Sequence, residues 1–92
     1  MNECRQKRKL GHQSLSFYEA DLHARLATCG LTPRQQQVVV LVMRGLSNRE
    51  IATKLLIEEY PVKVHLRDIF YRLKIHRRTA LLTKIFQLTH AN

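Results

Sequence analysis

The 92-residue chain carries 16 Lys+Arg against 7 Asp+Glu, and its formal net charge of +9 favours an anionic partner. This length allows one small domain and excludes a barrel enzyme or a dinucleotide fold with a separate substrate domain. The hydrophobic content of 45% excludes a wholly disordered chain, and the longest apolar run, Val38 to Met43, is too short to span a membrane.

The N-terminal third is predicted to contain a basic arm and one helix. Residues 1–13 have no apolar period, which indicates a flexible arm that is either solvated or touches phosphates. A helix is predicted over 16–29, because Ser16 and Glu19 match a capping box and Gly30 is a natural stop. Its apolar stripe consists of Leu15, Tyr18, Leu22 and Leu26.

The next helix, predicted over 32–44, has clear signals at both ends. Thr32 is the expected N-cap, Pro33 suits the first helical position, and Gln35 completes a capping box. Gly45 ends the helix. The β-branched run inside this segment is compatible with a strand, but the signals on both sides favour a helix.

Two further helices are predicted over 48–56 and 61–74. Ser47 and Glu50 form the capping box of the first. We place the start of the second at Pro61, because a residue that precedes proline is pushed out of the α region. The inward face of this second helix carries Val62, Leu66, Ile69, Phe70 and Leu73.

The last helix is predicted over 79–89. Its apolar residues exceed what one side of a small helix normally needs for its own core; they are Leu81, Leu82, Ile85, Phe86 and Leu88. Neither a strand nor an internal repeat is expected in this chain. The charged and polar remainder of the helix contains no acidic residue, so this end of the chain is basic.

The helices over 48–56 and 61–74, joined by a tight turn, have the layout of a helix-turn-helix. The outer side of the second helix carries Tyr60, Val64, Arg67 and Tyr71, flanked by Lys63 and Lys74. Valine can contact a thymine methyl, and lysine or arginine can reach guanine O6 and N7 in the major groove. The alternative is a solvated face with scattered apolar residues, which is common on protein surfaces. Tyr71 fits either a DNA contact or a buttress at the core edge or dimer.

Residues 31–88 resemble the LuxR-type (GerE, FixJ/NarL) helix-turn-helix domain of bacterial transcription regulators. The matching stretches are LTPRQQQVVVLVMRGLSNREIATKL, VKVHLRDIFYRLKI and RTALL. The resemblance implies an all-α, four-helix DNA-binding domain over 31–92. It also implies binding to double-stranded DNA as a homodimer. The additional N-terminal amphipathic helix over 14–30, predicted from its apolar stripe, precedes the part of the chain that the resemblance covers. The additional helix would cover the core or enlarge the dimer contact.

The resemblance also assigns residues by position. The base-contacting residues would be Lys63, Val64 and Arg67. Backbone contacts would come from Arg49 and His65, and the basic charge adds Arg72, Lys74, Arg77 and Arg78. The last helix would form the dimer contact through Leu82, Ile85 and Phe86.

This sequence departs from the family pattern at several positions. Glu58 replaces the usual serine before the recognition helix, Pro61 replaces a threonine, and Lys74 replaces a glycine. The lost hydroxyl at position 61 removes a capping or phosphate contact worth about 1 kcal/mol. The added Lys74 and Arg77, the latter in place of a serine or asparagine cap, restore electrostatic attraction. Gln35 and Gln37 stand where the family has glutamates.

We therefore predict a sequence-specific transcription regulator that places the helix over 61–74 in the major groove. The alternatives are a single-domain antagonist that pairs with a larger LuxR-type regulator, and a nucleoid binder that uses charge alone. The five histidines and two cysteines are dispersed, and no nucleophile stands beside a base, so no metal, cofactor or enzymatic activity is expected. No apolar stretch follows the first basic residues, so no secretory signal is expected. The two cysteines form no CxxC pair, which favours a reducing cytoplasm, and the predicted DNA binding adds association with the nucleoid.

Overall fold

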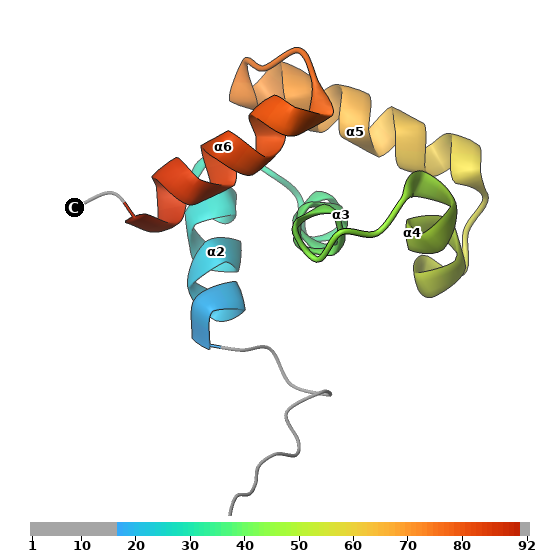
Figure 1. Ribbon diagram of the computed structural model, residues 1–92, viewed down its shortest axis with the longest axis horizontal. Coiled ribbons are helices and arrows are strands. Elements are labelled where there is room, and N and C mark those ends of the chain that lie inside the picture. Colours follow the sequence, from blue (N-terminus) through green and yellow to red (C-terminus); the bar gives the residue numbers. More distant parts are fainter. Residues whose placement is uncertain (1–16, 91–92) are drawn as a thin grey trace, which may run out of the picture.

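The computed structural model describes residues 17–90 of the chain, and every regular element in this range is an α-helix (Figure 1). The predicted all-α class is therefore confirmed. The helices are α2 (Phe17–Thr28), α3 (Pro33–Met43), α4 (Asn48–Leu55), α5 (Glu59–Leu73) and α6 (Arg78–His90). The predicted basic arm and the residues Leu15 and Ser16 lie outside the described range.

The predicted starts of α3 and α4 are confirmed by their hydrogen bonds. Thr32 Oγ1 accepts from the Gln35 backbone N–H, and Gln35 Oε1 accepts from the Thr32 N–H. Ser47 and Glu50 form the same reciprocal pair at α4. Each box satisfies backbone donors that have no partner within the helix, which fixes where each helix begins.

The capping box of α4 makes part of the stability depend on pH. The backbone N–H of Ser47 donates to the Glu50 carboxylate, and this bond lowers the pKa of Glu50 below its ordinary value of 4.5. The resulting stabilisation is complete above that ordinary value and is lost as the pH falls through the lowered pKa. We expect Glu50→Gln to be less stable than the parent at pH 7, with the difference shrinking at pH 3. Thermal melts at both pH values measure it, and an unchanged difference would contradict the assignment.

The predicted start of α5 at Pro61 was wrong by two residues. The helix begins at Glu59, with Glu58 as N-cap, so Tyr60 is helical and Pro61 is the third helical residue. Proline is tolerated there because the first N–H groups of a helix have no intrahelical acceptor. The absence of an N–H at Pro61 also removes the usual target of an N-cap side chain. Consistent with this, Glu58 makes no side-chain capping bond.

The core lies between all five helices. Its fully buried members include Leu22 and Leu26 of α2, Val38 and Val39 of α3, Ile51 of α4, Val62 and Ile69 of α5, and Leu81 of α6. The additional helix α2 packs against α3 and α6 (Figure 1). The described part of α2 therefore shares one core with residues of the segment 31–92. Covering this core is one of the two roles expected for the additional helix.

Polar contacts fix α2 on this core. The Glu19 carboxylate accepts from Arg44 Nε at 2.8 Å and from Arg44 Nη2 at 2.5 Å, and this pair joins α2 to the end of α3. Glu19 raises the pKa of Arg44 chiefly through its hydrogen bond. Tyr18 shares a hydrogen bond with Thr89 of α6 at 3.2 Å. The predicted stripe of α2 is thus buried at Leu22 and Leu26, whereas Tyr18 is 41% exposed.

The helix-turn-helix pair is joined by a three-residue turn. Leu56 is the C-cap of α4 and has left-handed backbone angles (φ +60°), and Lys74 is the C-cap of α5 with φ +59°. Both residues carry a Cβ in a conformation that favours glycine. The turn at Leu56 directs α5 back across α4 and α3, and the predicted inward residues Val62, Leu66, Ile69 and Leu73 are buried. The turn at Lys74 leads from α5 into α6.

Candidate functional site

The outward side of α5 forms an exposed ridge, defined here by Tyr60, Lys63, Val64, Arg67 and Tyr71. Tyr60, Arg67 and Tyr71 are exposed, Val64 is half-buried, and Tyr71 is 84% exposed. Tyr71 therefore does not buttress the core of this chain. The carboxylate of Asp68 lies 3.8 Å from Arg67 Nε, a surface pair that holds Arg67 only weakly. The ridge spans roughly 16 Å along the helix, from its first turn to its last.

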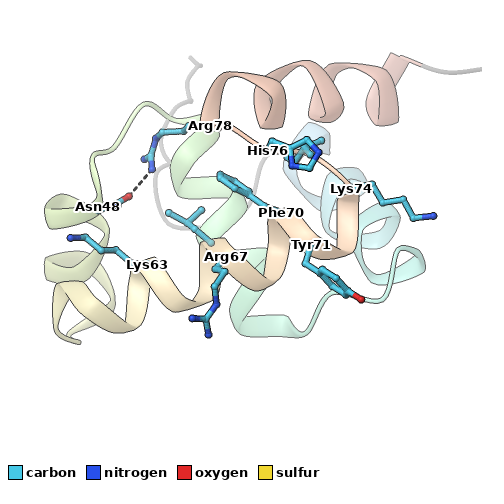
Figure 2. Close-up of a pocket in the computed structure, with 10 residues that line it drawn as sticks. Asn48, Lys63, Arg67, Phe70, Tyr71, Lys74, His76 and Arg78 are labelled. Atoms are coloured by element: carbon cyan, nitrogen blue, oxygen red, sulfur yellow. Dashed lines mark hydrogen bonds between the residues drawn. The ribbon is translucent and has the colours of Figure 1, made fainter.

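A groove of about 820 Å³ runs along one flank of α5, between α4 and the start of α6 (Figure 2). Its floor is apolar and comes from Leu66, Phe70 and Ile75. Its rim is basic, and the groove lining holds no carboxylate. Figure 2 shows Phe70 pointing up from α5 into this space, while Arg67 and Tyr71 project from the lower edge of the helix. The rim consists of Asn48, Lys63, Arg67, Tyr71, Lys74, His76 and Arg78.

The opposite flank of α5 differs in size and charge. A hollow of about 320 Å³ lies there, lined by Gln35, Asp68, Tyr71 and Arg72. A Cβ added at Gly30 would meet the Arg72 guanidinium at 2.9 Å, so Arg72 lies against the turn between α2 and α3. His65 is half-buried, about 200° around the helix from Lys63. The predicted backbone contacts Arg72 and His65 are thus on a different side from Lys63.

Arg78 is committed to contacts within the chain. Its Nη1 donates to Asn48 Oδ1 at 2.6 Å (Figure 2). Its Nη2 donates to the Leu46 carbonyl at 2.6 Å. These bonds tie the start of α6 to the turn before α4. Arg77, one residue earlier, is exposed, and so is Arg49 on α4. Among the residues predicted to contact the DNA backbone, the groove brings together Lys74 and Arg78 and leaves Arg49, His65, Arg72 and Arg77 outside its lining.

The predicted dimer residues of α6 divide between surface and core. Leu82 is 45% exposed and Phe86 is 59% exposed, and the Phe86 ring stacks on His90 with centroids 4.1 Å apart. Ile85 is only 2% exposed and packs in the core of this chain. A residue buried in its own core has no surface to offer a partner, so Ile85 cannot contribute to the contact as predicted. The exposed apolar surface of α6 consists of Leu82 and Phe86.

Sequence reasoning did not identify Asn48, Phe70 and His76 as parts of one site. Asn48 follows the Ser47 cap, Phe70 was assigned only to the inward face of α5, and His76 lies in the α5–α6 turn. The only available signal was the position of Asn48 at the start of a helix. Their meeting depends on how α6 folds back over α5, which local patterns do not specify.

Metal chemistry and membrane insertion find no structural support in the described range. Between residues 17 and 90, no group of three His, Cys, Asp or Glu side chains is close enough to bind a metal ion. Likewise, none of the helices described there has the length and apolar character needed to cross a bilayer. The candidate site is the ridge and groove of α5, because the groove lining combines an apolar floor with a basic rim.

Comparison with known proteins adds a family match. Residues 30–85 match the family described as bacterial regulatory proteins, luxR family. The chain is similar to the nitrate/nitrite response regulator protein homolog of Haemophilus influenzae, with 40% identity over 57 residues, which cover 62% of this chain and 27% of that protein. It is 35% identical over 57 residues to the nitrate/nitrite response regulator protein NarL of Escherichia coli, covering 62% and 26%.

A longer alignment joins the chain to the HTH-type transcriptional regulator AlkS of Alcanivorax borkumensis. Identity there is 38% over 68 residues, which cover 72% of this chain and 8% of AlkS. The chain thus spans about a quarter or less of the length of these relatives. No solved structure matches the chain. The family match covers α3, α4, α5 and part of α6, and it leaves α2 outside.

Proposed function

This chain belongs to the luxR family of bacterial regulatory proteins, and on that premise we propose that it is a sequence-specific DNA-binding transcription regulator. The observation that carries the proposal is the ridge of α5. Lys63, Val64 and Arg67 lie together on the side of α5 that faces away from the core. Their chemistry matches guanine acceptors and thymine methyl groups at base edges in the major groove.

In this proposal, α4 supports α5 while the ridge enters the major groove. The groove is about 12 Å wide, so it admits a helix with side chains of this size. Base contacts come from Lys63, Val64 and Arg67, and phosphate contacts come from the surrounding cations. Arg49 and Arg77 are exposed and free of carboxylate neighbours in the described contacts, which suits such a role. The bacterial nucleoid in the cytoplasm is then the place of action.

Two copies are proposed to bind together on paired half-sites, about one helical turn apart. The contact uses Leu82 and Phe86, whose exposed apolar side chains lie one helical turn apart on α6. Tyr18 of α2 reaches the C-terminal end of α6 through its hydrogen bond with Thr89. We include Tyr18 in the proposed dimer surface, which gives the additional helix its second predicted role.

Lys74 allows a test in which stability and binding change in opposite directions. Glycine accepts the backbone angles of this position without the clash that a Cβ makes, so Lys74→Gly is expected to raise the free energy of unfolding by about 1 kcal/mol. The same change removes a cation next to DNA. The slope of log K against log salt should shrink by about one for each bound chain. Chemical denaturation and binding titrations at several salt concentrations measure the two effects.

Leu56→Gly is the matched control for this variant. Leu56 has the same left-handed backbone and is 91% exposed, but it carries no charge. We expect the same gain in stability with an unchanged salt slope. If Lys74→Gly keeps the salt slope of the parent, Lys74 does not lie at the interface with DNA.

The experiment that tests the proposed function is selection of bound duplexes from a random DNA pool, with the stoichiometry measured on the winning site. We expect one enriched sequence with paired half-sites that binds two chains. Equal affinity for random and selected duplexes would favour the charge-only nucleoid binder instead. A chain that ignores DNA but captures a larger luxR-family regulator would favour the antagonist.

A further inference from the structure

We propose that the groove between α4, α5 and the start of α6 seats the sugar–phosphate backbone of one DNA strand, with Asn48 and His76 as phosphate contacts. This inference rests on the proposed function, because it requires α5 to lie in the major groove. It adds two residues to the interface and makes that interface asymmetric: one strand is held by the groove and the other is not.

The charges on the two flanks of α5 support this asymmetry. A helix in a major groove has a phosphate strand along each flank. On the groove side, Lys63, Lys74 and His76 line the space and the lining contains no carboxylate. On the other side, the smaller hollow contains Asp68, which repels phosphate and offsets Arg72. Electrostatic attraction is therefore concentrated on the strand that faces the groove.

The shape of the groove suits a sugar–phosphate chain. Phe70 and Ile75 are half-buried and form an apolar floor, and Figure 2 shows Phe70 between the basic side chains of the rim. A deoxyribose presents C–H groups that pack on such a floor, while its phosphates stay at the polar rim. The alternation of apolar and charged groups along a nucleic-acid strand thus matches the arrangement of the groove.

Asn48 is oriented by Arg78. Because Asn48 Oδ1 accepts the hydrogen bond from Arg78 Nη1, its amide nitrogen is the side-chain atom that remains to donate to a phosphate oxygen. Asn48 is also the first residue of α4, where the helix dipole favours an anion. Arg78 therefore acts as a positioning residue that holds the amide in place, a different role from the direct phosphate contact predicted from its charge.

The test uses the duplex selected on the full chain, with neutral methylphosphonate linkages placed one at a time on each strand. For the parent, we expect neutral linkages beside the groove to weaken binding about tenfold, and those on the other strand to weaken it much less. His76→Ala should weaken binding to the unmodified duplex by a similar factor. The affinity of this variant should then not fall further when the linkage that His76 faces in the parent is made neutral. Arg25→Ala removes a charge on α2, outside the groove lining, and should keep the full sensitivity of the parent.

Asn48→Asp separates a phosphate contact from a purely structural role. Aspartate keeps an acceptor for Arg78 and suits the start of a helix, so the fold should be retained, as a thermal melt would show. If Asn48 contacts a phosphate directly, Asn48→Asp should bind more than tenfold more weakly than the parent. Part of the lost affinity should return when the facing linkage is neutral, because the new carboxylate then has no charge to repel. Parent-like binding by Asn48→Asp, or equal effects of neutral linkages on both strands, would overturn the inference. Failure to select any duplex would instead reject the proposed function.

Discussion

Replacing Leu26 by alanine is expected to lower the free energy of unfolding by about 3 kcal/mol, the typical cost of truncating a fully buried leucine. Leu26 is fully buried in the core shared by α2, α3 and α6. Its truncation removes apolar burial and leaves a cavity that the surrounding helices fill only in part. Because α2 lies outside the family match, this result would show that the additional helix belongs to the folding unit.

Leu56→Ala is the control for this measurement. It deletes the same atoms at a side chain that is 91% exposed, and both the parent and the variant residue carry a Cβ in the left-handed conformation. Chemical denaturation should place this variant within about 0.5 kcal/mol of the parent. If Leu26→Ala loses no more free energy of unfolding than Leu56→Ala, the packing of α2 on the core would be contradicted.

The second large effect is expected on DNA binding. Arg67→Ala should weaken binding to the selected duplex by about 1–3 kcal/mol, which corresponds to roughly 5- to 150-fold. Arg67 stands at the middle of the ridge with its side chain largely exposed, so its loss should leave the fold intact. Affinity for random duplexes should change much less, because the lost contact is to a base rather than to phosphate.

Arg25→Ala is the control for Arg67→Ala, because it also removes one positive charge from the surface. Arg25 is also a partly exposed arginine with a neighbouring carboxylate, Asp21, but it lies on α2. Fluorescence anisotropy at one salt concentration should give parent-like discrimination between selected and random duplexes for Arg25→Ala. If Arg67→Ala discriminates as well as the parent, Arg67 does not contact a base.

Local sequence signals predicted most of the fold. The capping boxes at Thr32 and Ser47 are short-range hydrogen-bond patterns, so their sequence alone determined where α3 and α4 begin. The start of α5 was missed because the rule for the residue before proline describes a preference. Pro61 lies in the first turn of α5, where its missing N–H costs no intrahelical hydrogen bond, so Glu59 and Tyr60 are helical despite that preference.

The candidate site was predictable only where it lies on one helix. The ridge residues of α5 follow from helical periodicity, which is a property of a single segment. The groove required α4 and α6 to meet α5, and the bonds of Arg78 to Asn48 and Leu46 join positions about 30 residues apart. In the same way, the apolar pattern of α6 did not separate Ile85, which is buried in the core, from the exposed Leu82 and Phe86.

The central claim, that the ridge of α5 enters the major groove, is tested most directly by NMR titration of the chain with the selected duplex. We predict that the largest shifts of backbone amide signals occur at Lys63, Val64 and Arg67, with smaller changes along the groove. Undisturbed signals from α5, accompanied by shifts on another surface such as α2, would contradict the account.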